Sequence, residues 1–177
     1  MFAEVVFQPY KAEASLGNFL VRGEIRSRGE LTGYLNDRRW SYLTFYQASM
    51  QPLDTDRRIG ALEQSSSSLN KQWIEFLALT SDEDASKVQV QQFYWRVQFY
   101  TRHFAIQGDL RVGGDAHDED LFEEIRDFFP VSRASVFPIR PVAVTPISKS
   151  PLLFINRRMV QVYRVVGKSG MLPPLPE

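Results

Sequence analysis

The sequence predicts a mainly β, internally duplicated fold of two bent antiparallel units, each shaped like a small barrel and each with one short helix. Several segments alternate apolar and polar residues with period two, which is typical of half-buried strands. Short blocks of sequence from the first half recur in the second half in the same order. Of the 177 residues, 44% are hydrophobic and 13% are aromatic, which is enough apolar material for a real core.

Four sequence blocks appear twice along the chain. The pairs are FLVRGEIR (19–26) with FAIQGDLR (104–111), LTGYLND (31–37) with LFEEIRD (121–127), RWSYLTFYQASM (39–50) with FFPVSRASVFPI (128–139), and LNKQWIEFL (69–77) with INRRMVQVY (155–163). Asn70 follows Gly23 by 47 positions, and Asn156 follows Gly108 by 48. We interpret the pattern as a duplicated unit. The alternative is two β hairpins that look alike because all amphipathic strands share this alternation.

Each unit is expected to begin with two strands joined by a short turn. The first strands are predicted at residues 3–13 and 87–100, and the second strands at 19–26 and 104–111. Gly23 and Gly108 lie in the middle of the second strands, where a bulge or a sharp bend is the usual reason for a glycine.

A polar loop and a short helical turn are predicted next in each unit. The helical pattern is strongest at residues 118–129, where apolar residues at helical spacing follow an Asp-rich start. Two more strands then close each unit, at 41–47 and 72–79 in the first and at 134–144 and 159–166 in the second. Pro138, Pro141 and Pro146 predict that the third strand of the second unit lies at a sheet edge or is broken.

The predicted boundaries follow from these elements. Residues 1–80 form the first unit, 81–87 the linker, 88–166 the second unit and 167–177 a disordered tail. Within the first unit, residues 54–68 have the composition of a long excursion between strands, which is either functional or a flexible insertion.

Composition excludes several classes of chemistry. The chain has no cysteine, so disulfides, thiolate nucleophiles and thiolate metal sites are excluded together. No apolar run approaches the roughly 18 residues that a membrane helix needs. The start of the sequence shows no basic-then-apolar leader, so we expect a cytoplasmic protein without membrane contact.

The charge is balanced overall, with 21 basic and 21 acidic residues, but the two halves differ. Residues 1–85 contain 9 basic and 12 acidic residues, whereas residues 86–177 contain 12 and 9. This difference permits head-to-tail contact between halves or between copies. It is too small to indicate nucleic-acid binding by itself, because a strongly basic face supplies most of that affinity.

The repeated blocks resemble Sm-like domains, which are small β-barrels of the SH3 type. Gly23 with Ile25, and Gly108 with Leu110, are similar to the glycine and aliphatic pair in that family's second strand. Residues 69–76 and 155–162 resemble its closing strand. The resemblance implies a five-stranded barrel that assembles edge to edge and often binds RNA at an inner rim. A tandem bacterial domain of uncharacterised function would have the same appearance.

The chain departs from the Sm pattern in the segments that bind RNA in that family. The Asp-x-x-Met-Asn loop and the Arg-Gly-Asn turn are both absent. Asn70-Lys71 and Asn156-Arg157 occupy the second of these regions. RNA binding is therefore not carried over from the resemblance.

No set of residues predicts catalysis, a metal site or a cofactor. The segment GGDAHDED at 113–120 is the densest polar cluster, but it lacks the spacing of a calcium-binding loop and is best read as a solvated turn before a helix. His103 and His117 are the two histidines, too few for a multi-histidine zinc site, and His103 falls at a predicted turn. We therefore expect a protein that is not an enzyme.

Two groups of residues are candidates for binding. The first comprises the predicted turns with Asn70 and Lys71 and with Asn156, Arg157 and Arg158, which could line a small anion-binding rim. Polar turns with solvated flanks are the alternative. The second comprises Tyr94 and Arg96, on one face of a strand whose other face carries Trp95. That polar face could stack on bases, but packing against the other unit or another subunit is the preferred interpretation.

The predicted function is a non-enzymatic module for protein interaction or assembly, with a protein partner or self-association. The second hypothesis is binding of nucleic acid or a small anion through the Asn/Lys/Arg turns. A basic stripe that joins both turns would favour nucleic acid, whereas an exposed apolar patch would favour interaction.

Overall fold

The computed structural model describes residues 7–56, 59–113, 122 and 125–169. The strands in this part of the chain are β1 (Phe7–Leu16), β2 (Phe19–Arg28), β3 (Tyr42–Pro52), β4 (Leu62–Asn70), β5 (Ile74–Leu79), β6 (Phe93–Tyr100), β7 (Phe104–Val112), β8 (Phe128–Pro138), β9 (Lys149–Asn156) and β10 (Val162–Ser169). Two short helices, α1 (Leu31–Asn36) and α2 (Asp82–Ser86), and two 3₁₀ turns, η1 (Lys71–Trp73) and η2 (Arg157–Met159), accompany them.

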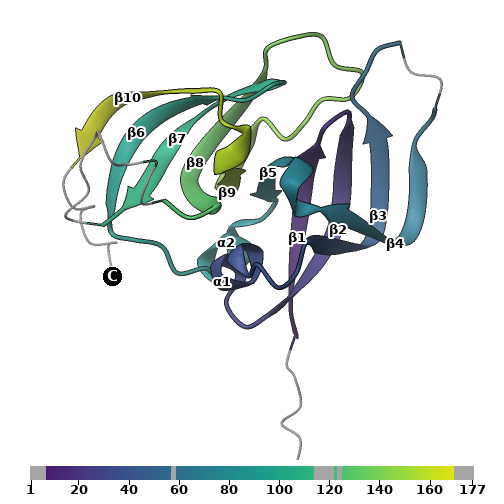
Figure 1. Ribbon diagram of the computed structural model, residues 1–177, viewed down its shortest axis with the longest axis horizontal. Helices are drawn as coiled ribbons and strands as arrows, with labels where there is room; N and C mark the ends of the chain where they lie inside the picture. The colour runs from purple at the N-terminus through teal and green to yellow at the C-terminus, as the bar shows by residue number, and fades with distance from the viewer. Residues whose placement is uncertain (1–6, 57–58, 114–121, 123–124, 170–177) are drawn as a thin grey trace, which may run out of the picture.

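The ten strands form one antiparallel sheet in the order β10-β6-β7-β8-β9-β5-β1-β2-β3-β4. Figure 1 shows the two ends of the chain's sheet, β10 and β4, on opposite sides of the molecule. The predicted mainly β, antiparallel class is confirmed. The strands form one open sheet, however, and not two separate small barrels, because the pairing of β5 with β9 joins them.

The two halves of the sheet have the same strand order. In the first half, residues 7–80, the order is β5-β1-β2-β3-β4, and in the second half, residues 88–169, it is β10-β6-β7-β8-β9. In each half the strand that comes last in the sequence pairs with the strand that comes first. The first half therefore contributes β5, and the second half β9, to the joint between them.

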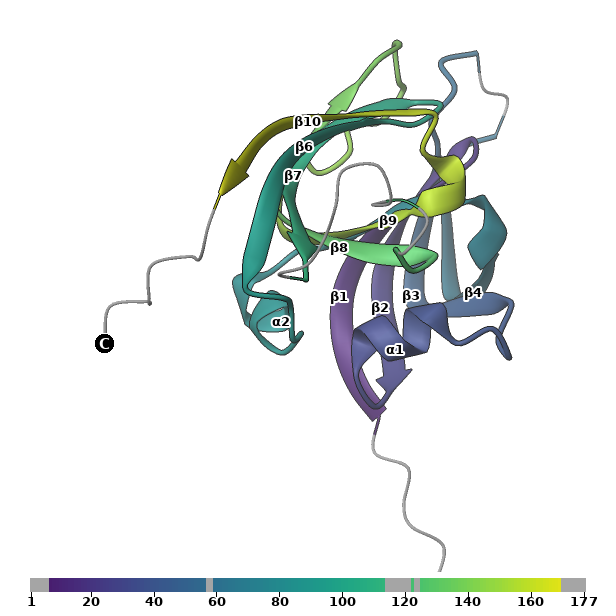
Figure 2. The ribbon, with the colours of Figure 1, turned by 60° about the vertical axis from the view of Figure 1, so that its left-hand side comes forward.

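The hydrophobic core has two parts that lie on opposite faces of the sheet. Along β5, Leu77 points into the first part and Phe76 into the second. Along β9, Phe154 points into the first part and Leu153 into the second. Every residue of β5 is buried, because alternate side chains leave a strand on opposite faces and both faces are covered here. Figure 2 shows β6, β7 and β10 curving over β8 and β9.

Gly23 and Gly108 are required by two equivalent bulges, as the mid-strand glycines predict. The β2–β3 register shifts at Gly23, and the β7–β8 register shifts at Gly108. The bulged residues on the facing strands, Gln47 and Arg133, both have φ of 49°. A Cβ on Gly23 would lie 2.7 Å from the Tyr46 carbonyl oxygen, so the strands could not approach as closely with any other residue.

The first half departs from prediction at one strand. Residues 62–68, predicted as part of an excursion between strands, belong to β4 at the edge of the sheet. This strand was missed because its serine-rich sequence has no apolar alternation. The segment predicted as a linker, 81–87, contains α2, which begins after Ser81 caps it by accepting a hydrogen bond from the Asp84 amide.

The second half departs from prediction in three ways. Its third strand is β8, which starts at Phe128 rather than 134 and lies between β7 and β9 rather than at an edge, with Pro138 as its last residue. Phe128 and Phe129 belong to this strand, so the helix predicted over 118–129 does not extend to its expected end, and half of that segment lies outside the described residues. The strand β9 was not predicted.

No helix in the described part of the chain is both long enough and apolar enough to cross a membrane.

Candidate functional site

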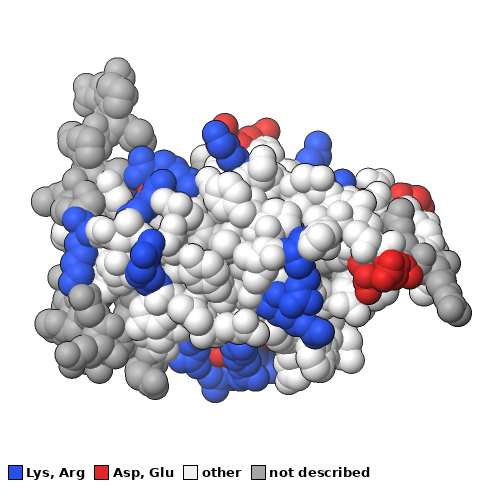
Figure 3. All heavy atoms as spheres, turned by 90° about the horizontal axis from the view of Figure 1, so that it is seen from above, with Lys and Arg blue, Asp and Glu red and all other residues white. Residues whose placement is uncertain are grey.

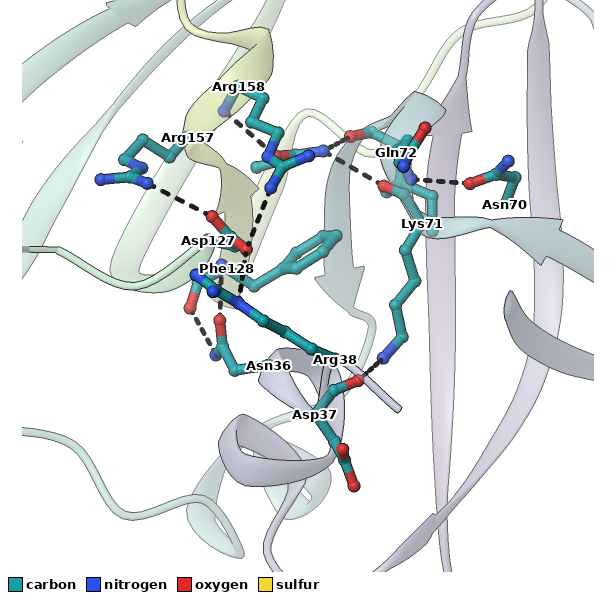
Figure 4. A network of polar contacts seen from close by, with 12 residues as sticks. Asn36, Asp37, Arg38, Asn70, Lys71, Gln72, Asp127, Phe128, Arg157 and Arg158 are labelled. Carbon is teal, nitrogen blue, oxygen red and sulfur yellow. Dashed lines mark hydrogen bonds and ion pairs between the residues drawn. The ribbon is translucent and has the colours of Figure 1, made fainter. Parts of the chain in front are cut away.

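The two predicted Asn-basic turns meet at the joint between the halves. η1 lies between β4 and β5, η2 lies between β9 and β10, and the pairing of β5 with β9 brings them together. The side-chain amide of Asn156 donates hydrogen bonds to the carbonyl oxygens of Lys71 (3.1 Å) and Ile74 (2.9 Å), and its Oδ1 accepts one from the Arg158 amide at 3.1 Å (Figure 4). Asn156 is buried, so this amide fixes one turn against the other.

Asn70 caps its own turn. Its Oδ1 accepts a hydrogen bond from the Gln72 amide at 3.0 Å and so caps η1, as Asn156 caps η2. The predicted equivalence of the two asparagines thus holds for their caps. Only Asn156 also links the two halves.

Lys71 is buried and points at the end of α1. Its ammonium donates to the carbonyl oxygens of Tyr34 (3.1 Å) and Asp37 (3.3 Å), which lie at the C-terminal end of this helix. Burial lowers the pKa of Lys71, and the nearby Asp37 carboxylate partly opposes this shift. The lysine predicted as a ligand-binding residue therefore holds α1 in place.

Asp127 gathers three arginines from both halves. Its carboxylate lies 3.4 Å from Arg157 Nη2, 3.6 Å from Arg158 Nη2 and 3.8 Å from Arg38 Nε. Arg157 is further held by the Phe122 carbonyl oxygen, to which it donates at 2.9 Å. Arg38 and Arg158 remain largely exposed, with 84% and 55% of their side-chain surface accessible.

A pocket of about 230 Å³, here called the junction pocket, opens between these groups. Its walls are Leu35, Asn36, Asp37, Arg38, Trp40 and Ser41 from the end of α1 and the segment after it, Lys71 and Gln72 from η1, and Asp127, Phe128, Asn156 and Arg158 from the second half. Figure 4 shows Arg38 and Arg158 approaching Asp127 from opposite halves. The pocket is thus built by residues far apart in the sequence.

Arg38, which lies in this wall, and its neighbour Arg39, which lies outside it, differ in what they contact. Arg39 donates hydrogen bonds to the Asp37 carboxylate through Nε (3.0 Å) and Nη2 (2.7 Å), and this pairing holds the pKa of Asp37 at about 2. Arg38 makes no side-chain hydrogen bond to any residue in the described ranges, and the same is true of the Arg158 guanidinium. Their donor groups remain available to a ligand.

The second predicted group, Tyr94 and Arg96, lies elsewhere. The predicted alternation along their strand is confirmed, with Trp95, Val97 and Phe99 buried. Arg96 Nη1 contacts the buried Asp109 at 2.8 Å, and the Tyr94 ring lies under the Arg133 guanidinium at 5.3 Å. Since Asp109 and Arg133 belong to the same half, these contacts do not join the two halves, and neither residue lines the junction pocket.

His103 is part of a second polar link across the joint. The β6–β7 turn places it against Glu75 on β5, where His103 Nδ1 pairs with Oε1 and the Thr101 hydroxyl donates to Oε2 at 2.6 Å. All three side chains are buried. Among the described residues there is no cluster of three or more His, Asp or Glu that could hold a metal ion, and the acidic segment 115–120 with His117 lies outside them.

The candidate binding residues predicted from the sequence included both turns but not Arg38, Trp40 or Asp127. No model of a protein family, no curated protein and no solved structure matches the chain. The resemblance to Sm-like domains thus stays a prediction.

Proposed function

We propose that the protein is a non-enzymatic assembly module whose copies join head to tail through the edge strands β4 and β10. One observation carries this proposal. β5 and β9 pair with each other inside the chain. By their place in the strand order of each half, β5 of the first half is equivalent to β10 of the second, and β9 of the second half is equivalent to β4 of the first. A joint between β4 of one copy and β10 of the next would repeat that pairing.

We also infer that the two halves arose by duplication of one unit. The equal strand order, the bulges at Gly23 and Gly108 and the left-handed residues Gln47 and Arg133 support this inference. The sequences around the left-handed residues agree as well, since Gln47 and Arg133 are each followed by Ala-Ser. The proposed joint requires only that the two halves have equivalent strand geometry, whether or not they arose by duplication.

The internal joint specifies the register of the proposed one. Phe76 pairs with Ile155, and the equivalent positions are Val162 on β10 and Leu69 on β4. Within the positions that the internal joint covers, this register also places Arg164 of one copy opposite Ser67 of the next. The joint gives no register beyond Val165, because β10 has a bulge between Val165 and Gly167.

Exposed apolar side chains also gather at the two edges. Tyr42, on the strand next to β4, is 57% exposed, whereas its equivalent Phe128 is 3% exposed at the internal joint. Trp73 follows β4 directly and is 61% exposed, and Val162 on β10 is 58% exposed. Large apolar residues beside an unpaired strand edge favour association.

The proposed joint is weaker than the internal one. Where β9 has the apolar residues Leu152, Leu153 and Phe154, β4 has three serines, Ser66 to Ser68. Main-chain hydrogen bonds would form equally well, but less apolar surface would be buried. We therefore expect reversible, concentration-dependent association.

Sedimentation velocity over a series of protein concentrations tests the proposal, together with the variant Val162→Asp. The equivalent residue at the internal joint, Phe76, is buried, so the proposed joint would bury the new carboxylate without a partner. The variant should weaken association about tenfold or more, as expected for an unpaired buried polar group.

Phe137→Asp, at a similarly exposed apolar position outside both edges, is the matched control and should change association little. A wild-type chain that stays monomeric at every concentration would overturn the proposal. So would a Val162→Asp variant that associates as tightly as the wild type, because Val162 would then not lie in the joint.

A further inference from the structure

We propose that the junction pocket binds a small phosphate monoester, with Arg38 and Arg158 contacting the phosphate and Trp40 lining the space for the rest of the molecule. The pocket lies within a single chain, so this inference is independent of the assembly proposed above.

Positive charge exceeds negative charge around the pocket. Of the residues that line it, Arg38, Lys71 and Arg158 are cationic, and Asp37 and Asp127 are carboxylates. Asp37 is already paired with Arg39, which lies outside the lining. The single negative charge of Asp127 faces three guanidinium groups, those of Arg38, Arg157 and Arg158. A phosphate dianion would neutralise the excess, and guanidinium groups fit its oxygens bidentately.

Arg38 and Arg158 have unused hydrogen-bonding capacity. Arg38 and Arg158 lie 3.8 and 3.6 Å from Asp127, which is ion-pair contact rather than hydrogen-bond distance. Each guanidinium has five N–H groups, and neither donates a side-chain hydrogen bond to any residue that the structure describes. Asp127 thus keeps both groups near the pocket without occupying their donors.

Hydrogen bonds hold the segments that carry the pocket residues in place. Asn156 is 2% exposed and bonds η1 to η2, Lys71 is 8% exposed and fixes the end of α1, and Asn36 holds the start of β8. Ligand-contacting groups gain affinity when buried hydrogen bonds pre-position their supports. The pocket is therefore formed before a ligand arrives.

The size and surroundings of the pocket favour a small molecule over a nucleic acid strand. A volume of about 230 Å³ suits a phosphate with one ring, and Trp40, which is 47% exposed, offers that ring an aromatic surface. On the face of the molecule seen in Figure 3, basic side chains lie in separate groups and form no continuous stripe. A nucleic-acid strand would need such a stripe along its backbone.

Isothermal titration calorimetry with phenyl phosphate, inorganic phosphate and benzoate tests the inference. We expect saturable binding of phenyl phosphate at millimolar concentration or below, weaker binding of inorganic phosphate, and little binding of benzoate. Arg38→Ala and Arg158→Ala should each weaken phenyl phosphate binding about tenfold or more, because each removes charge-assisted hydrogen bonds.

Arg140→Ala is the matched control, since this arginine is exposed, carries the same charge and does not line the pocket. It should leave affinity within about twofold, a change small beside the tenfold loss. Absence of saturable phosphate binding, or an equal loss in Arg140→Ala, would overturn the site. Benzoate binding as tightly as phenyl phosphate, or a short RNA binding more tightly than either, would overturn the ligand class.

Discussion

Single residues decide how closely the strands of each half can approach. Gly23 and Gly108 leave room for the facing bulge, and in each case the facing residue adopts a left-handed conformation. Strand alternation alone predicts the core-facing residues on both sides of such a glycine. The glycine itself predicts the bulge, because glycine is otherwise disfavoured in the interior of a strand.

Gly108→Ala should lower the free energy of unfolding by about 1–3 kcal/mol, the usual result of overpacking a closed interior. The new Cβ would lie 2.4 Å from Val131 Cγ1 and 3.0 Å from the Ser132 carbonyl oxygen. Urea unfolding measures the change. Gly167→Ala is the control in an edge strand, with no atom within 4 Å of its Cβ, and should cost nothing. Equal stability of the two variants would show that the bulge can relax.

At the scale of elements, the sequence misses two strands that show no alternation of apolar and polar residues, β9 and β4. β9 is apolar at four consecutive positions from Leu152 to Ile155, because both of its faces are covered at the joint. β4 is polar along Ser65 to Ser68 because it lies at the edge. Neither shows period two. The junction pocket could not be predicted either, because it depends on the long-range pairing of β5 with β9.

α1 is tied to the second half by one amide. Asn36 Nδ2 donates to the Phe128 carbonyl oxygen at 2.8 Å, and Asn36 Oδ1 accepts from the Phe128 amide at 2.8 Å. Asn36→Ala should lower the free energy of unfolding by about 1–3 kcal/mol, because two partly buried backbone groups lose their partner. Chemical denaturation measures this change.

Thr32→Val on the same helix provides the opposite case. The Thr32 hydroxyl is buried and has no hydrogen-bond partner among the described residues, so the variant should leave stability unchanged or raise it. A loss in Thr32→Val as large as that in Asn36→Ala would assign both effects to the helix itself rather than to its contact with β8.

At the scale of the whole molecule, the two parts of the core depend on each other. β5 belongs to the first half, yet its Phe76 packs edge-on against Phe104 of the second, with ring centroids 5.2 Å apart. β9 likewise sends Phe154 into the first part of the core. Separating the halves would expose one face of each strand. The sequence predicts two units, and because they share these core contacts we expect them to fold together.

The whole chain should therefore unfold in one cooperative transition, although it consists of two similar halves. Val136→Ala, buried in the second part of the core, should cost about 2 kcal/mol and shift the urea midpoint of both halves equally. Tryptophan fluorescence measures each half separately, since Trp95→Phe leaves only Trp40 and Trp73 in the first half, and Trp40→Phe/Trp73→Phe leaves only Trp95 in the second. Phe137→Ala, at a neighbouring exposed position, is the control. If Val136→Ala shifts the Trp95 signal and leaves the midpoint of Trp40 and Trp73 in place, the halves unfold independently, and the contacts through β5 and β9 do not couple them.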